Sequence, residues 1–178
     1  HDEEEDGGER ELLAQLEVLL GLADAGRQLL AGQPRHDGSS GTHGGLVAGF
    51  LGNHIHIPIV GIGVSRDPAD QAPLVLKEAQ AVVDLIGAGF TVPPDSVQCV
   101  GGYWQPKYSV PNARMVEAVQ LLARTEALLL DPVYTGKIMA GLIDLARQGV
   151  IQPGERVLFL HTGGAPALYA YQNVLQGR

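Results

Sequence analysis

The sequence predicts an α/β fold of three layers, in which helices cover both faces of a mainly parallel β-sheet. The first reason is that short segments rich in Val, Ile and Leu alternate with longer segments of helical periodicity. The second is that small polar residues follow several of the apolar segments, and ligands of parallel sheets bind at the carboxyl ends of strands. The third is composition, because 45% hydrophobic and 18% charged residues are ordinary for a chain with a core.

Composition also excludes several kinds of partner. The formal net charge is −8 and there is no basic stripe, so we expect no nucleic acid partner. No apolar run is long enough to cross a bilayer, and the acidic first ten residues do not resemble a signal peptide. Cys99 is the only cysteine, which excludes an internal disulfide and fits a reducing compartment. We therefore expect a cytoplasmic protein with no membrane partner.

The chain divides into a lead-in and a larger folded part. We assign residues 1–37 to an acidic tail, a helix at 9–20 with leucines at helical spacing, and an irregular lead-in. The folded part, 38–178, begins with a loop of small residues at 38–42 and a helix at 42–51.

Strands and helices alternate through the remainder of the chain. We predict strands at 55–64, 97–100, 128–130 and 156–160, and helices at 68–86, 112–125, 136–147 and 166–175. Pro58 lies inside the first of these predicted strands. We therefore expect either that this part is an edge strand or that the strand begins after Pro58. Asn112 is a candidate cap for the helix that follows it.

The loop at residues 38–42 has the composition of an anion-binding loop. Its glycines allow the backbone N–H groups to approach an anion, its hydroxyls add donors, and the following helix contributes its positive end. Ser40 or Thr42 is the candidate cap of that helix. The loop has neither the P-loop lysine nor the dinucleotide pattern of glycines. The alternative interpretation is a flexible Gly/Ser turn.

Two later loops place polar residues after apolar segments. His161, Thr162, Gly163 and Gly164 follow the predicted strand at 156–160, and the alternative there is a simple tight turn. In the segment Asp131–Lys137, the Tyr134 hydroxyl can act as an acid, a base or a hydrogen-bond donor. The alternative is a buried tyrosine whose hydroxyl is satisfied internally.

Taken together, four segments resemble one enzyme family. SSGTHGGL, YSVPN, LLLDPVYTGK and VLFLHTGGAPALYAY occur in this order, and they resemble the D-cysteine desulfhydrase and 1-aminocyclopropane-1-carboxylate (ACC) deaminase family. The similarity runs from Gly38 to Gln172. It implies pyridoxal phosphate as cofactor and the fold of the tryptophan synthase β-subunit. It also implies that residues 38–178 are the C-terminal portion of this fold, with the N-terminal part missing.

The resemblance implies a role for each matching residue. The cofactor-binding residues are then Gly38, Ser39, Ser40, Gly41 and Thr42 at the phosphate, and Thr135, Thr162 and Gly163 near the pyridine ring. The candidate catalytic residues are Tyr108 and Tyr134.

Thr135 indicates which reaction of the family to expect. It stands where ACC deaminases carry a glutamate at the pyridine nitrogen and desulfhydrases carry a threonine. A hydroxyl leaves that nitrogen largely unprotonated, whereas a carboxylate would keep it protonated. The resemblance thus implies a pyridoxal-phosphate-dependent lyase that converts D-cysteine to pyruvate, ammonia and sulfide by α,β-elimination. ACC deamination, L-cysteate elimination and an inactive phosphate-binding homologue remain alternatives.

The lysines depart from the family pattern. The chain contains only Lys77, Lys107 and Lys137, and none lies in the family's N-terminal motif with the lysine that binds the cofactor. We therefore expect this chain alone to be inactive, with the lysine supplied by an N-terminal part. A cleaved or split enzyme, a truncated chain and a degenerate homologue are the three explanations. The family also implies a homodimer.

No metal site is expected. His54 and His56 are two residues apart, which would put both side chains on one face of a strand. No carboxylate or cysteine cluster accompanies them, so we interpret them as polar residues before a strand.

Overall fold

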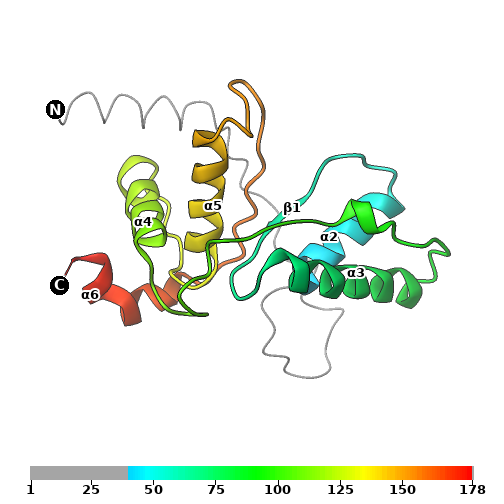
Figure 1. The fold of residues 1–178 in the computed structure, drawn as a ribbon, viewed down its shortest axis with the longest axis horizontal. Helices are drawn as coiled ribbons and strands as arrows, with labels where there is room; N and C mark the ends of the chain where they lie inside the picture. Colours follow the sequence, from blue (N-terminus) through cyan, green and yellow to red (C-terminus); the bar gives the residue numbers. More distant parts are fainter. Residues whose placement is uncertain (1–39, 178) are drawn as a thin grey trace. The chain divides into compact units, whose positions relative to one another are not determined.

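The computed structural model describes residues 40–177, and these residues form two compact units (Figure 1). Residues 40–110 belong to the first, named here the α2–α3 unit, and residues 111–177 to the second, the α4–α5 unit. The predicted helix at 9–20 and the rest of the lead-in lie outside the described residues.

The α2–α3 unit is built around a parallel strand pair. It contains α2 (Ser40–Gly52), β1 (Val60–Ile62), α3 (Pro68–Leu85), η1 (Pro94–Ser96) and β2 (Gln98–Val100). The strands pair in parallel with Val60 opposite Gln98, and α3 makes the crossover between them, as parallel strands require. The helix begins at Pro68 because its missing N–H group is not needed in the first turn.

Helices α2 and α3 lie side by side in this unit (Figure 1) and share its core. The buried side chains there are Val47, Ala48, Ala79, Val83 and Val92. Gly44 lets the two helix backbones approach closely, because a Cβ atom at this position would lie 2.9 Å from the backbone nitrogen of Ala79. The unit therefore depends on glycine where α2 crosses α3.

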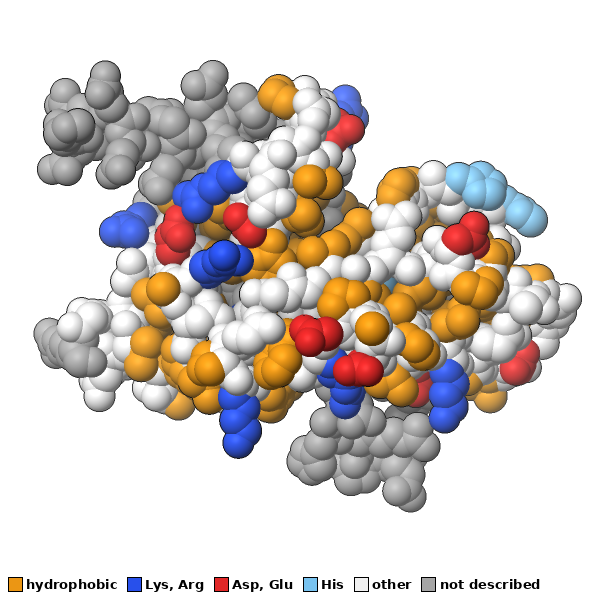
Figure 2. Space-filling view, viewed as in Figure 1, with side chains coloured by type: hydrophobic (Ala, Val, Ile, Leu, Met, Phe, Trp, Pro, Cys, Tyr) orange, Lys and Arg blue, Asp and Glu red, His pale blue; other side chains and the backbone are white. Residues whose placement is uncertain are grey.

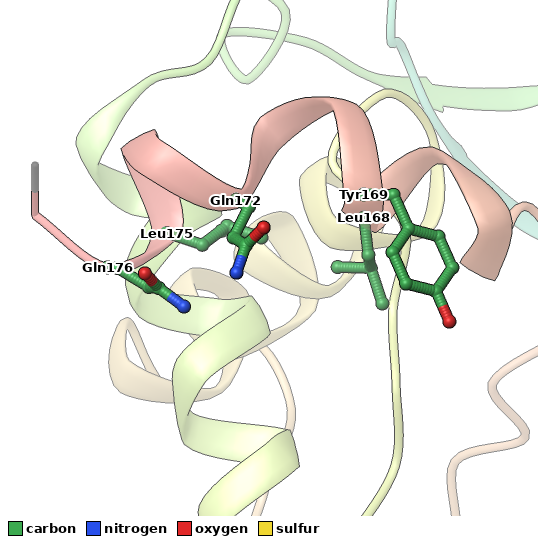
Figure 3. Close-up of a pocket in the computed structure, with 5 residues that line it drawn as sticks. All are labelled: Leu168, Tyr169, Gln172, Leu175 and Gln176. Carbon is green, nitrogen blue, oxygen red and sulfur yellow. The ribbon is translucent and has the colours of Figure 1, made fainter.

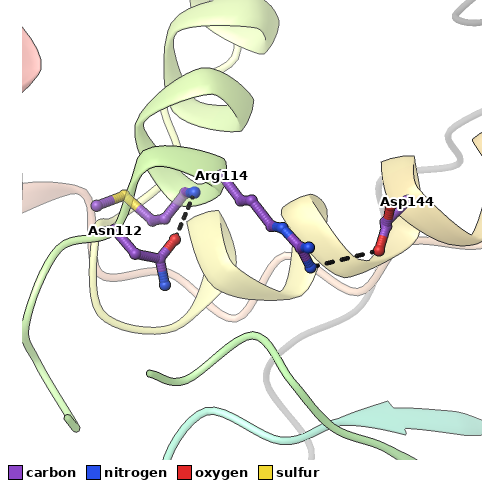
Figure 4. Close-up of polar contacts among 4 residues, drawn as sticks. Asn112, Arg114 and Asp144 are labelled. Atoms are coloured by element: carbon purple, nitrogen blue, oxygen red, sulfur yellow. Dashed lines mark hydrogen bonds and ion pairs between the residues drawn. The ribbon is translucent and has the colours of Figure 1, made fainter. Parts of the chain in front are cut away.

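The α4–α5 unit has a larger apolar core. It contains α4 (Ala113–Thr125), α5 (Thr135–Arg147), η2 (Ala165–Tyr171) and α6 (Gln172–Leu175). The predicted cap of α4 is confirmed, since Asn112 Oδ1 accepts a hydrogen bond from the Met115 N–H at 2.9 Å (Figure 4). The fully buried core side chains include Met115, Leu122, Leu130 and Met139.

Ion pairs connect the exposed sides of α4 and α5. Arg114 lies 3.5 Å from Asp144 (Figure 4), and Arg147 lies 2.7 Å from Glu117. Figure 2 shows the resulting patch of neighbouring basic and acidic side chains over these helices. Because the side chains are partly exposed, each pair contributes little to stability, about 0–1 kcal/mol.

Several boundaries differ from the prediction. The predicted strands at 128–130 and 156–160 are not strands, and the one at 55–64 is reduced to β1. Leu130 is 1% exposed and Leu129 is 56% exposed, so the burial alternates as in a strand. A strand also needs a hydrogen-bonded neighbour, and the sheet among the described residues has two strands.

Two helical predictions also need correction. Ser40 and Thr42 do not cap α2 but lie within its first turn. The first turn tolerates such residues because its N–H groups have no intrahelical partner. The predicted helix at 166–175 is a 3-10 segment, η2, followed by the short α6.

Candidate functional site

The start of α2 is the described part of the predicted phosphate loop. Ser40, Gly41 and Thr42 form its first turn, where the N–H groups lack intrahelical acceptors and the helix dipole is positive. Ser40 is buried and Thr42 is exposed, so this end of α2 offers hydroxyl and N–H donors together. Such donors suit a phosphate group. Gly38 and Ser39, the other two predicted phosphate residues, lie outside the described residues.

His43 fixes this helix to β1. Its ring fills the space above Gly61, where a Cβ atom would lie 2.4 Å from the ring Nδ1. Burial lowers the pKa of His43, against the opposing effect of a backbone hydrogen bond with Ile59. The ring Nε2 is buried and has no hydrogen-bond partner among residues 40–177. The start of α2 is thus held in place by a neutral, buried ring.

Tyr108, the first predicted tyrosine, follows a loop that is tied to α3 by a hydrogen bond. Trp104 Nε1 donates a hydrogen bond to Asp67 Oδ1 at 2.9 Å, which ties this loop to the start of α3. Tyr108 follows in the same unit with 41% of its surface exposed, and Ser109 has a positive φ of 64°. Non-glycine residues in this backbone region are uncommon and concentrate at functional sites.

Asp131 organises the segment that carries the second tyrosine. Its side chain is fully buried, and its Oδ1 accepts hydrogen bonds from the N–H groups of Val133 at 2.8 Å and Tyr134 at 2.7 Å. Its Oδ2 accepts from the N–H and from the hydroxyl of Thr135, both at 2.7 Å. These bonds fix the turn that enters α5 and therefore fix the backbone of Tyr134.

The Thr135 hydroxyl is hydrogen-bonded to Asp131 in two ways. Its Oγ1 also accepts a hydrogen bond from the Asp131 N–H at 2.8 Å, and the side chain has no exposed surface. The next residue, Gly136, is a close contact point, because a Cβ atom there would lie 2.7 Å from both the Asp131 carbonyl oxygen and Val119 Cγ2. A glycine at 136 thus permits α5 to begin against α4.

The loop at residues 161–164 is held against the segment that ends at Asp131. The Gly163 N–H donates to His161 Nδ1 at 3.1 Å, so Nε2 carries the ring hydrogen and donates to the Leu129 carbonyl, also at 3.1 Å. Gly164, at φ 96°, abuts Asp131, where an added Cβ atom would lie 2.8 Å from its Cγ. Thr162 lies between these anchors and is partly exposed.

The structure thus groups the predicted residues by unit. Tyr134, Thr135, Thr162 and Gly163 lie in the α4–α5 unit, around Asp131, while the described phosphate residues and Tyr108 lie in the α2–α3 unit. Sequence reasoning missed Asp131 and Gly164 as site residues. An Asp followed by Pro after an apolar segment is a signal for a turn in which the Asp side chain accepts backbone hydrogen bonds, and it could have identified Asp131.

Lys137 is the buried lysine of the site segment. It lies in the first turn of α5 with no exposed surface, and burial lowers its pKa. The Lys137 amine is therefore not presented to solvent.

Other surface features carry no predicted site residue. A hollow at the C-terminal end is lined by Leu168, Tyr169, Gln172, Leu175 and Gln176 (Figure 3). No group of three His, Cys, Asp or Glu side chains in the described part of the chain is arranged to hold a metal ion. Within residues 40–177, no helix combines the length and the apolar character needed to span a bilayer.

Known proteins resemble the chain over most of its length. The family model "Pyridoxal-phosphate dependent enzyme" matches residues 29–163. D-cysteine desulfhydrase of Salmonella typhi is 41% identical over 161 residues, which are 90% of this chain and 46% of that protein. The protein of the same name from Salmonella newport (strain SL254) has the same identity and coverage.

A solved structure gives the same result for the fold. The crystal structure of an ACC deaminase homologue matches with a TM-score of 0.64 and 34% identity, over 79% of this chain and 42% of that chain. The predicted α/β fold of this enzyme class is thereby confirmed. The chain spans about half the length of the curated relatives it matches.

The residues present suit the cofactor of this family, which is pyridoxal phosphate. Within the α2–α3 unit, the start of α2 supplies N–H and hydroxyl donors of the kind that bind a phosphate. Within the α4–α5 unit, Thr162 and Tyr134 are partly exposed and carry hydroxyls of the kind that bind a polar ring. Both the family match and this donor set lead to one conclusion. The chain belongs to the family of pyridoxal-phosphate-dependent enzymes.

Proposed function

We propose that this chain forms the C-terminal part of a pyridoxal-phosphate-dependent lyase that acts on a small amino acid by α,β-elimination. D-cysteine is the first candidate substrate, with pyruvate, ammonia and sulfide as products. The observation that carries the proposal is the 41% identity to a D-cysteine desulfhydrase over 90% of the chain. The presence of a threonine at position 135, where the deaminases carry a glutamate, supports elimination over ring opening.

The chain's own residues would share the work as follows. Gly38 and Ser39, together with Ser40, Gly41 and Thr42 at the start of α2, would bind the phosphate. Thr135, Thr162 and Gly163 are the residues that the resemblance assigns to the ring, and of these Thr162 and Gly163 are partly exposed. When bound, pyridoxal phosphate supplies an electron sink for the negative charge that develops at the substrate α-carbon.

The two tyrosines are the candidates for proton transfer. The Tyr134 hydroxyl would protonate the leaving sulfur, and Tyr108 would orient the substrate, or the two roles are exchanged. Tyr134 is the better placed of the two as a fixed group, because the Asp131 carboxylate holds its backbone N–H at 2.7 Å.

The lysine that binds the cofactor would come from another segment. Lys137 is buried in α5, and Lys77 and Lys107 match no lysine motif of the family. We therefore propose a complementary N-terminal part that carries this lysine, in a cytoplasmic enzyme that self-associates.

The test is an elimination assay on the chain with and without a lysine-bearing N-terminal part. We expect sulfide and pyruvate from D-cysteine only in the combined sample, with a higher kcat/KM than for L-cysteine, L-cysteate or ACC. Tyr134→Phe should lower kcat about 10²- to 10⁴-fold. Tyr169→Phe, at an 86% exposed position, is the matched control and should leave the rate unchanged.

ACC deamination is the second candidate, favoured by the match to an ACC deaminase homologue. If 2-oxobutanoate from ACC formed faster than pyruvate from D-cysteine, this candidate would replace the first. Cofactor binding without any turnover in the combined sample would instead favour an inactive homologue.

A further inference from the structure

Asp67 stands at the cap position of α3, but its side chain does not cap the helix. Its backbone has the extended conformation of a cap, with φ −80° and ψ 157°, and aspartate is among the preferred capping residues. The side chain nevertheless makes no capping hydrogen bond. Its Oδ1 instead accepts a hydrogen bond from Trp104 Nε1 at 2.9 Å, across 37 positions of the sequence. A local contact that would stabilise α3 is thus replaced by a contact with a distant loop.

The loop that contains Trp104 is anchored to the same turn of α3 at a second point. Gly101 packs against Pro68, because a Cβ atom at position 101 would lie 2.5 Å from Pro68 Cδ. Tyr103, which lies between the two anchored positions in the sequence, is buried. The loop after β2 is therefore fixed to the residues with which α3 begins.

Tyr108 follows these anchors in a tight turn. The Val110 N–H donates to the Lys107 carbonyl at 3.1 Å, which closes a turn around Tyr108 and Ser109. Ser109 has a positive φ of 64°, and a non-glycine residue keeps such a conformation only where the surrounding structure holds it. The hydrogen bond of Trp104 supplies such a hold a few residues before Tyr108.

These contacts lie at the end of the strand pair where a ligand is expected. Asp67 comes after the carboxyl end of β1, and the loop with Trp104 comes after the carboxyl end of β2. The two strands are parallel, and ligands of parallel sheets bind at the carboxyl ends of strands. The segment that leads to Tyr108 is therefore tied down at the edge of the sheet that a substrate would approach.

We propose that Asp67 and Trp104 are a pair of positioning residues that hold Tyr108 in place for the substrate. The inference rests on the proposed function, because Tyr108 is one of its candidate catalytic residues. The pair acts through Tyr108 and not by contact with the substrate.

The first test is the kinetics of the chain combined with its lysine-bearing N-terminal part. Asp67→Ser keeps a good capping residue, but its hydroxyl ends one bond closer to the backbone than the carboxylate oxygen that Trp104 reaches. Asp67→Asn keeps an acceptor oxygen at that place. We expect Asp67→Ser and Trp104→Phe to lower kcat/KM for D-cysteine about three- to tenfold, the usual value of one hydrogen bond, and Asp67→Asn to lower it less. Asp70→Ser, at an exposed acidic residue in the same turn of α3, is the matched control and should leave kcat/KM unchanged.

The Tyr108→Phe background separates positioning from a merely structural effect. If the pair acts through the Tyr108 hydroxyl, Asp67→Ser should lower kcat/KM no further once that hydroxyl is removed. Equal losses from Asp67→Ser with and without the hydroxyl would overturn the proposal, and so would full activity of Asp67→Ser itself.

A second measurement needs no turnover. Trp104 is the only tryptophan, so its indole N–H gives a single signal in a ¹⁵N spectrum of the chain. We expect hydrogen exchange at this group and at the Val110 amide to be about three- to tenfold faster in Asp67→Ser than in the wild type, and unchanged in Asp70→Ser. Equal exchange in Asp67→Ser and the wild type would overturn the proposal. If the wild type shows no lyase activity, the proposed function is rejected, while this comparison still decides whether the pair holds the turn at Tyr108.

Discussion

Replacing two adjacent glycines of α2 by alanine should affect the stability of the protein differently. A Cβ atom at Gly44 would lie 2.9 Å from Ala79 N and 3.1 Å from the Val75 carbonyl oxygen, both backbone atoms of α3. A Cβ atom at Gly45 would meet nothing within 4 Å. Since backbone atoms of a packed helix cannot turn away, Gly44→Ala must push α2 and α3 apart, whereas Gly45→Ala fits without movement.

The magnitude follows from two contributions. Each substitution gains about 1 kcal/mol because alanine favours the helix over glycine. Gly44→Ala alone also pays for overpacking, typically about 1–3 kcal/mol. The helix contribution is common to both variants, so the difference between their free energies of unfolding isolates the overpacking at about 1–3 kcal/mol, with Gly45→Ala the more stable.

Urea unfolding followed by tryptophan fluorescence is a suitable assay. Trp104 is the only tryptophan, and it lies in the same unit as α2 and α3. We expect the urea midpoint of Gly45→Ala to rise and that of Gly44→Ala to fall relative to it, with an unchanged m-value. If Gly44→Ala stabilised the protein as much as Gly45→Ala does, the close approach of α2 to α3 would be refuted.

The remaining predictions concern one buried ring and two local stabilising contacts. Gly61→Ala should destabilise by about 1–3 kcal/mol, because its Cβ atom would lie 2.4 Å from His43 Nδ1, and His43→Ala should relieve part of this cost in a double-mutant cycle. Burial lowers the pKa of His43, so the unfolded chain binds the His43 proton more tightly than the folded chain does. The free energy of unfolding should therefore be highest above about pH 6.5 and should fall as the pH drops below that value. The urea midpoint measured against pH should fall less in His43→Gln than in the wild type. Asn112→Ala should cost about 1 kcal/mol through loss of the α4 cap, and an intact thermal midpoint would contradict the cap. Arg147→Gln should cost under about 1 kcal/mol, and less in high salt, because its pair with Glu117 is exposed; a larger loss that persists in salt would contradict this.

Local sequence signals were sufficient for the helices and their caps. The periodicity of α3, α4 and α5 and the cap at Asn112 could be predicted within a residue or two, because each depends on residues near in sequence. The segments at 128–130 and 156–160 could not, since a strand requires a hydrogen-bonded neighbour that no local pattern supplies.

The candidate site divides in the same way. The hydroxyl and glycine residues were readable from loop composition and from the family resemblance. The role of Asp131 was not, because it depends on bonds to three following residues and on contact with Gly164, 33 positions away in the printed sequence. Such a carboxylate looks like an ordinary turn residue until the geometry places four donors around it.

The most direct test of the central claim is a borohydride trap. The chain is combined with its lysine-bearing N-terminal part, mixed with pyridoxal phosphate and reduced, and any phosphopyridoxyl-lysine is mapped by mass spectrometry. We predict a label on a lysine in a peptide outside this sequence, which would place the cofactor in a site completed by an N-terminal part. No label, or a label scattered over Lys77, Lys107 and Lys137, would contradict the claim that this chain is part of a working pyridoxal-phosphate lyase.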